Sequence, residues 1–203
     1  MQQLLFNEEL SNKNFLPFDG EVYVYQNFFN SMESELYFNT LMNSITWKQD
    51  KMKLYGREVA LPRLTAWYGE HSKDYSYSGI NSKALPWTPE LLEIKMRVES
   101  IAKVNFTSAL LNLYRTGNDH VSWHRDNEKV LRVNPVIASV SFGATRTFKF
   151  RNIRDKSVVR SIELTSGTYI LMKGETQHNW EHSITKSKKV DAPRINLTFR
   201  ILF

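Results

Sequence analysis

The stretch NLYRTGNDHVSWHRD, residues 112–126, ends with a histidine and an aspartate two positions apart. Side chains two apart in an extended strand point to the same face, so His124 and Asp126 aim an imidazole and a carboxylate at one point. Trp123 and Arg125 then turn away. A second histidine would complete a face of two histidines and one carboxylate, which suits Fe(II) and leaves metal positions open for a co-substrate and oxygen. A lone His-x-Asp also arises by chance, so this pattern alone does not establish a metal site.

The last segment, RINLTFR at residues 194–200, has the same two-residue period. Its polar row consists of Arg194, Asn196, Thr198 and Arg200, and its apolar row of Ile195, Leu197, Phe199 and Ile201. Two guanidinium groups on one face can hold a small dicarboxylate bidentately. The alternative is a half-exposed strand whose polar side meets water.

Five separated motifs, in this order, are similar to those of one enzyme family: residues 112–114, 124–128, 139–143, 182–183 and 194–200. From about Tyr55 to Phe203 the chain resembles the AlkB family of Fe(II)/2-oxoglutarate dioxygenases, and most of all the branch that repairs alkylated DNA. The resemblance implies a double-stranded β-helix core that uses Fe(II), 2-oxoglutarate and O₂. It also implies oxidation of N-methyl groups on nucleobases, with N1-methyladenine and N3-methylcytosine as the leading lesions and succinate and formaldehyde as products.

The resemblance also assigns metal ligands. It adds His182, which Ser183 follows, to His124 and Asp126. His178 also lies in a polar loop of this region and is therefore an alternative for the distal ligand. It ranks second because it does not match the family position.

Co-substrate residues follow from the same comparison. Arg194 and Arg200 match the family arginines that hold the carboxylates of 2-oxoglutarate, and Asn196 and Thr198 lie on the same strand face. Asn112 and Tyr114 match a pair that hydrogen-bonds its oxygens.

Residues 47–61 predict a hairpin broken at Gly56, with Tyr55 and Arg57 beside the turn. The resemblance makes this hairpin a probe of base stacking, with an aromatic wedge and a basic neighbour. An aromatic residue beside a turn also serves as a cross-strand packing partner.

Tyr75 and Tyr77 share a strand face, and the family places a substrate lid there whose rings cover the flipped base. Their alternative role is in the core.

After His124-Arg125-Asp126, many DNA-repair members carry two acidic residues, whereas this chain has Asn127 and Glu128. Glu128 can accept from an exocyclic amine, but Asn127 cannot supply the same charge. The resemblance therefore predicts the reaction better than the base preference.

The composition bounds these expectations. Lys and Arg outnumber Asp and Glu to give a formal net charge of +6, which suits DNA or RNA as a partner. Basic residues gather at 186–189 and at 146–154, where the alternative is a solvated face. Zero cysteines exclude disulfides and thiolate chemistry. The first residues lack a secretion signal and no apolar run is long enough to span a bilayer, so we expect a soluble intracellular protein, cytoplasmic in a bacterium or nuclear in a eukaryote. We also expect a monomer.

The periodicity predicts a mainly β fold with flanking helices, in which a jelly roll forms the core. One helix follows a cap at Asn30 or Ser31, with an apolar stripe of Met32, Leu36, Leu41 and Ile45. A second helix opens at Thr88-Pro89-Glu90. Strands are expected at Ala109–Arg115, Val136–Phe142, Thr145–Arg151, Val158–Leu164, Thr168–Lys173 and Arg194–Phe203. The 203 residues read as a single dioxygenase domain: an arm at 1–20, a hairpin and nucleotide-recognition lid at 47–82, and a catalytic core at 105–203.

Two functions from other classes remain open at this point. One is an iron hydroxylase or demethylase that acts on RNA, a protein or a small molecule, against which the basic clusters and the hairpin argue. The other is a jelly roll that binds nucleic acid without catalysis, which the loss of a metal ligand or an arginine would have favoured.

Overall fold

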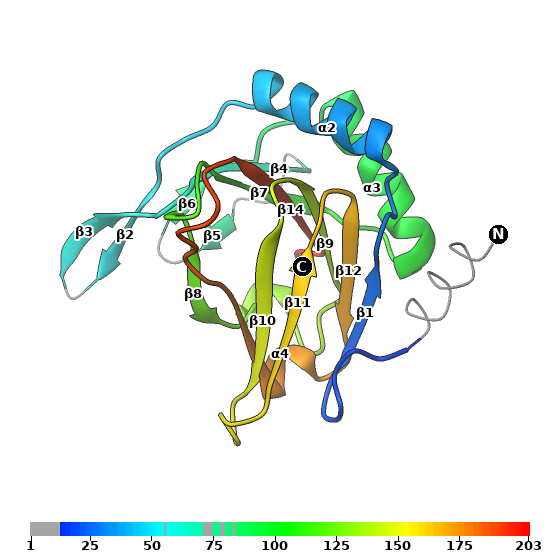
Figure 1. Ribbon diagram of the computed structural model, residues 1–203, viewed down its shortest axis with the longest axis vertical. Coiled ribbons are helices and arrows are strands. Elements are labelled where there is room, and N and C mark those ends of the chain that lie inside the picture. The colour runs from blue at the N-terminus through cyan, green and yellow to red at the C-terminus, as the bar shows by residue number, and fades with distance from the viewer. Residues whose placement is uncertain (1–12, 55, 71–74, 78–79, 83) are drawn as a thin grey trace.

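The computed structural model describes residues 13–54, 56–70, 75–77, 80–82 and 84–203. In these residues the larger sheet is antiparallel and has the order β1 (Glu21–Tyr25), β12 (Thr168–Lys173), β9 (Ile137–Gly143), β14 (Arg194–Arg200), β7 (Ser108–Tyr114) and β4 (Leu64–Gly69). The smaller sheet has the order β11 (Val159–Leu164), β10 (Arg146–Asn152), β13 (Trp180–Ile184) and β8 (Val121–His124). This architecture confirms the predicted jelly roll (Figure 1).

The two sheets enclose an apolar layer. Val22 of β1 and Ile170 of β12 pack there with Phe150 of β10 and Trp180 of β13, and all four are buried. The alternation along β10 explains this layer, because every second side chain of Arg146–Asn152 is buried. The layer therefore forms the apolar core between the two sheets.

Helices α2 (Ser31–Ser44) and α3 (Pro89–Ala102) cover the outer face of the larger sheet (Figure 1). Asn30 caps α2 through a capping box with Glu33, as predicted. Thr88 caps α3, and Leu91, Ile94 and Val98 form its buried stripe. Apolar residues of β14 complete the core on this side of the sheet.

The predicted stripe of α2 is partly wrong. Met32 is 81% exposed and Leu36 is 64% exposed, whereas Ser34, Tyr37 and Leu41 are buried. The spacing of 34, 37 and 41 follows one helix face, and positions 32 and 36 lie on the opposite side. Tyr37, whose ring contacts Phe29 edge-to-face and Phe142 at a tilt, takes the core position instead.

Two small hairpins complete the fold. β2 (Lys51–Leu54) pairs with β3 (Arg57–Ala60), and the pair projects away from the sheets (Figure 1). β5 (Tyr75–Tyr77) pairs with β6 (Ile80–Ser82). Two short helices, η1 (Lys129–Leu131) and α4 (Thr176–Asn179), follow β8 and precede β13. None of the helices within the described ranges has the length and apolar character that crossing a membrane requires.

Candidate metal and co-substrate site

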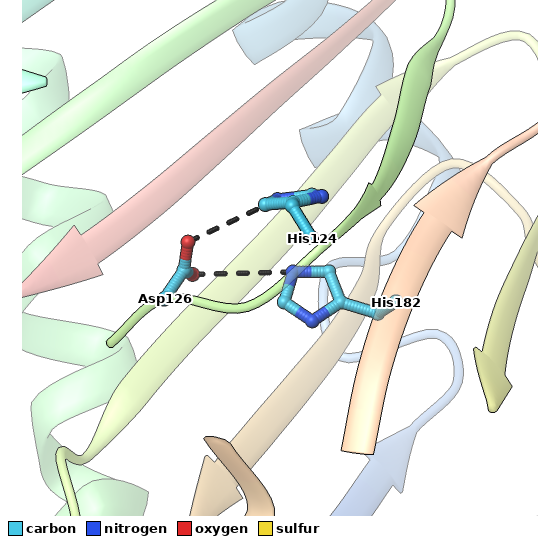
Figure 2. Close-up of side chains that lie close together, drawn as sticks. All are labelled: His124, Asp126 and His182. Atoms are coloured by element: carbon cyan, nitrogen blue, oxygen red, sulfur yellow. Dashed lines mark ion pairs between the residues drawn. The ribbon is translucent and has the colours of Figure 1, made fainter. Parts of the chain in front are cut away.

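Strands β8 and β13 bring two histidines side by side. His124 ends β8 and is the direct cross-strand partner of His182 in β13, and their ring centroids are 4.2 Å apart. Asp126 follows two residues later, outside the strand, so the prediction of one extended strand through both residues is wrong in detail. The carboxylate nevertheless faces both rings, as Figure 2 shows.

The three side chains form a compact group. Nε2 of His124 lies 3.9 Å from Oδ1 of Asp126, and Nε2 of His182 lies 4.0 Å from Oδ2. All the candidate ligand atoms lie within 4.8 Å of one another. Nδ1 of His124 lies 2.9 Å from the carbonyl of Ser122 and donates to it, which keeps the lone pair of Nε2 free for a metal. His178 is exposed on α4 and is not in this group, so the geometry favours His182.

Burial keeps these ligands in the protonation states that a metal needs. Burial, with the neighbouring His124, lowers the pKa of His182 to about 3, so the imidazole is neutral at physiological pH. Burial raises the pKa of Asp126, but the neighbouring Arg200 guanidinium, which also donates a hydrogen bond to the carboxylate, is the main cause that brings the pKa down to about 2. A neutral imidazole and an ionised carboxylate are the forms that bind a divalent metal.

Asp126 is held by two partners that are distant in sequence, one in strand β14 and one in helix α4. Nη2 of Arg200 donates to its Oδ1 at 2.9 Å, and its backbone N–H donates to Oε1 of Gln177 at 2.9 Å. All three residues are buried. Arg200 therefore orients the metal-binding carboxylate as well as facing the co-substrate pocket.

Arg194 offers the donors that a bound carboxylate would need. It is 1% exposed, its Nη2 donates to Ser141 at 2.8 Å, and its guanidinium lies 5.1 Å from the ring centroid of Tyr114. Its Nε and Nη1 have no hydrogen-bond partner among the described residues. Burial lowers the pKa of Arg194 to about 10, which leaves the group charged at neutral pH. Buried charged donors without a partner are costly, and an anion bound beside them removes the cost. The site therefore fits 2-oxoglutarate as well as the metal.

One pocket contains the predicted ligands and co-substrate residues. The members that line it are Asn112, Tyr114, His124, Asp126, His182, Arg194, Asn196, Thr198 and Arg200. The even-numbered row of β14 faces this pocket, and Ile195, Leu197 and Phe199 enter the helix-covered core. Asn196 donates to Ser139 and to the carbonyl of Val140, and Thr198 donates to Asn196. Asn196 and Thr198 thus have hydrogen bonds to strand β9 or to each other, and these bonds fix their side chains along the wall of the pocket.

The predicted substrate residues that the structure describes belong to three separate segments of the chain. Gly56 has a φ of +77°, a value that favours glycine, and exposed Arg57 follows it at the start of β3. Tyr55 lies outside the described residues. Tyr75 and Tyr77 are placed by their backbone, in β5. Asn127 is exposed beside the metal motif, and Glu128 is half-buried. Oε2 of Glu128 is buried with no hydrogen-bond partner in the described part of the chain.

The basic clusters divide into two kinds. Lys186, Lys188 and Lys189 are exposed, on a loop that backbone bonds between Gly117 and both Ser187 and Val190 hold in place. Arg146 belongs to the basic group predicted at 146–154 and lies in the hairpin of β10 and β11, but the alternative of a solvated face is wrong for it. It is 2% exposed and donates to the carbonyls of Thr116, Asp119 and Thr185, because the alternation that buries Phe148 and Phe150 also turns Arg146 inward.

The pocket and the residues that contact its lining include members that the sequence reasoning missed: Arg63 and Ser139 line the pocket, and Ser141 and Gln177 bond to residues that line it. Ser139 and Ser141 line up with Thr198 and Asn196 across β9 and β14, a position that the two-residue period of β9 would have indicated. Arg63 precedes β4, is buried, and donates through Nε to Oδ1 of Asn112 at 2.7 Å. No local pattern marks Arg63 or Gln177.

Comparisons with known proteins agree with this geometry. A family described as the 2OG-Fe(II) oxygenase superfamily matches residues 21–200. Alpha-ketoglutarate-dependent dioxygenase alkB homolog 3 of Mus musculus is 39% identical over 193 residues, which cover 91% of this chain and 67% of the relative. DNA oxidative demethylase ALKBH2 of Bos taurus is 39% identical over 158 residues, 74% of this chain and 56% of the relative.

Solved structures share the fold at low identity. The structure of OsALKBH1 matches with a TM-score of 0.63 and 16% identity, covering 92% of this chain and 99% of the other. A prolyl hydroxylase from Trichoplax adhaerens, in complex with a peptide fragment of the hypoxia inducible factor oxygen degradation domain, matches with the same TM-score and identity. It covers 100% of this chain and 93% of that one.

Proposed function

The chain belongs to the AlkB family of Fe(II)/2-oxoglutarate-dependent dioxygenases, and from that membership we propose that it removes N-linked methyl groups from the bases of alkylated DNA by oxidation. One observation supports the proposal above the others. One pocket is lined both by the His124, Asp126 and His182 group and by Arg194, which has donors without a described partner.

Ferrous iron fits the first group, since two imidazoles and one carboxylate leave positions open on the metal. Iron held there would supply the oxidation of the methyl group, with O₂ as the oxidant and with 2-oxoglutarate as the co-substrate that is converted to succinate and CO₂. The remaining step needs little from the protein. The hydroxymethyl group on nitrogen releases formaldehyde and leaves the unmodified base.

The protein's own residues bind and orient the reactants. Arg194 is placed to bind one carboxylate of 2-oxoglutarate through the donors that lack a partner. We assign Asn112 and Tyr114, which line the same pocket, to its oxygens. Arg200 keeps the Asp126 carboxylate turned toward the histidines. The apolar side chains of Val121, Phe148 and Ile184 border the pocket and limit the access of water.

The substrate side of the site suits a nucleobase that has left its stack. Methylation on the pairing edge weakens pairing, which lowers the cost of flipping the base. Glu128 has a carboxylate oxygen without a described partner beside the metal motif and can accept from an exocyclic amine. The hairpin with Gly56 and Arg57 projects where it can meet a duplex, and the exposed lysines at 186–189 suit phosphates. We propose that the protein acts as a monomer on single- and double-stranded DNA, with RNA as the alternative substrate.

The deciding experiment compares nucleic-acid substrates directly. Protein reconstituted with Fe(II) is incubated with 2-oxoglutarate and oligonucleotides that contain N1-methyladenine or N3-methylcytosine, as single strands, duplexes and RNA. We expect formaldehyde and an oligonucleotide lighter by one CH₂ group. The double variant His124→Ala/Asp126→Ala serves as the control and should be inactive. Turnover of 2-oxoglutarate on peptides but on none of the oligonucleotides would instead favour a protein hydroxylase, an activity that the fold also supports in the prolyl hydroxylase.

A further inference from the structure

The metal ligand Asp126 lies where the sheet no longer holds the backbone. Strand β8 ends at His124, and residues 125–128 form an irregular segment before η1. His124 is fixed by its pairing with His182, whereas Asp126 makes no ladder bond. Its backbone N–H therefore needs a partner from another part of the chain, since a buried N–H without an acceptor is costly.

Gln177 supplies that partner. It is 1% exposed and accepts from the Asp126 N–H through Oε1 at 2.9 Å. A backbone N–H only donates, so the amide must turn its oxygen toward Asp126 and its nitrogen away. The nitrogen then faces Sδ of Met172 at 3.6 Å, a weak acceptor within the apolar layer. The orientation of the side chain is thus fixed from both sides.

The helix that carries Gln177 is itself anchored. The hydroxyl of Thr176 accepts from the N–H of Glu21 at 2.8 Å and donates to the carbonyl of Lys173 at 2.6 Å. Nε1 of Trp180 donates to the carbonyl of Phe18 at 3.1 Å. Helix α4 passes at Trp180 into β13, the strand of His182. One short turn of chain therefore places the second histidine and also holds the loop of the carboxylate.

We propose that Gln177 is a positioning residue for the metal centre, which sets the backbone of Asp126 so that its carboxylate faces His124 and His182. Arg200 then fixes the rotation of the carboxylate, and the two contacts together define its place. The inference rests on the metal site of the proposed function. Partners of this kind behind a metal ligand typically contribute about 10- to 100-fold to metal affinity. Loss of the Gln177 acceptor should weaken metal binding by a factor in that range.

The test is the substitution Gln177→Met, which keeps an unbranched side chain of similar length and removes the acceptor. The matched control is Asn152→Leu, because Oδ1 of Asn152 also accepts from backbone N–H groups, those of Arg154 and Asp155, in a turn of β10 and β11. Metal-free protein is titrated with Co(II), an oxygen-stable substitute for Fe(II). Affinity is measured by calorimetry and by the visible absorption of the bound ion, and thermal unfolding is followed in parallel.

We expect Gln177→Met to weaken Co(II) binding and change the absorption spectrum, and Asn152→Leu to lower the melting temperature with Co(II) affinity unchanged. Unchanged affinity in Gln177→Met would overturn the inference, and so would an equal loss in the control. A wild-type protein that binds no Co(II) would refute the proposed function and the inference together. A wild type that binds Co(II) with Gln177→Met equal to it would refute the inference alone.

A second measurement covers the case in which Gln177→Met does not fold. Amide hydrogen exchange of the metal-free wild-type protein, followed by NMR, reports directly on the Asp126 N–H. We expect strong protection of this amide although it lies outside the strand. Exchange at the rate of a solvated loop amide would show that Gln177 does not hold it, and the inference would fall.

Discussion

Arg194 provides the sharpest test of the co-substrate assignment. In the substitution Arg194→Lys the positive charge stays, but the planar group with donors in several directions is lost. The guanidinium has one bond to Ser141 and two nitrogens without a described partner. A lysine ammonium that keeps the contact with Ser141 has fewer donors left for a carboxylate, and none in a planar fork.

The size of the effect follows from that difference in donors. Loss of one hydrogen bond to a charged group is worth about 1.5–3 kcal/mol, which corresponds to about 10- to 150-fold in affinity. The KM for 2-oxoglutarate should rise by a factor in this range. The KM for the methylated oligonucleotide should change far less, because the described contacts of Arg194 are with Tyr114 and Ser141 and not with the residues assigned to the base.

The assay measures succinate release against 2-oxoglutarate concentration at saturating oligonucleotide. Arg146→Lys is the matched control, since Arg146 is also buried and its guanidinium also faces the Tyr114 ring, at 5.7 Å. Its donors bind backbone carbonyls, so the control should lose stability and keep its KM for 2-oxoglutarate. An unchanged KM in Arg194→Lys, or an equal rise in Arg146→Lys, would refute the assignment.

Further predictions concern stability and substrate form. Between the ordinary pKa of histidine near 6.5 and the folded value of about 3, the unfolded state takes up a proton at His182 that the folded state does not. Metal-free protein should therefore lose up to about 1.4 kcal/mol of unfolding free energy per pH unit as the pH falls below 6.5. In His182→Leu, the unfolding free energy measured by urea titration at several pH values should depend less steeply on pH. Arg200→Met should cost about 3–5 kcal/mol because the charge of Asp126 stays buried without its partner, and the double variant Arg200→Met/Asp126→Leu should recover part of that loss in denaturant unfolding. Tyr55→Ala should reduce demethylation of duplex more than of single-stranded oligonucleotide; an equal reduction in both would leave the hairpin with a packing role only.

Two-residue periodicity predicted much of this fold. The strands β7, β9, β10, β11, β12 and β14 begin within one residue of the expected positions, because alternation is a direct consequence of strand geometry. Helix α2 was harder. Its apolar residues do not all lie on one face, so a stripe drawn through Met32 and Leu36 selected the solvent side. The burial of Tyr37 depended on its contacts with Phe29 and Phe142, which local sequence does not specify.

The site divided in the same way. His124, Asp126 and the even row of β14 were visible as short-range patterns, and the resemblance to a family connected them with His182. The bond between Gln177 and Asp126 joins residues 51 apart in sequence, and the bond between Arg200 and Asp126 joins residues 74 apart. Such contacts depend on how strands pair, and a single sequence does not reveal that pairing. For Arg146 the signal existed, since its alternation with Phe148 and Phe150 indicated an inward position that the charge obscured.

The position of β14 between two unlike surroundings limits how this gene can change. Its odd-numbered side chains pack in the apolar core beneath the helices, and its even-numbered side chains line the polar pocket. Loss or gain of one codon within 194–200 would shift the downstream residues to the opposite side, so that guanidinium groups would enter the core and leucine or phenylalanine would enter the pocket. Single substitutions there can be graded in effect, but a change in length would remove folding and chemistry together. Insertions should therefore be confined to the loops that flank this strand.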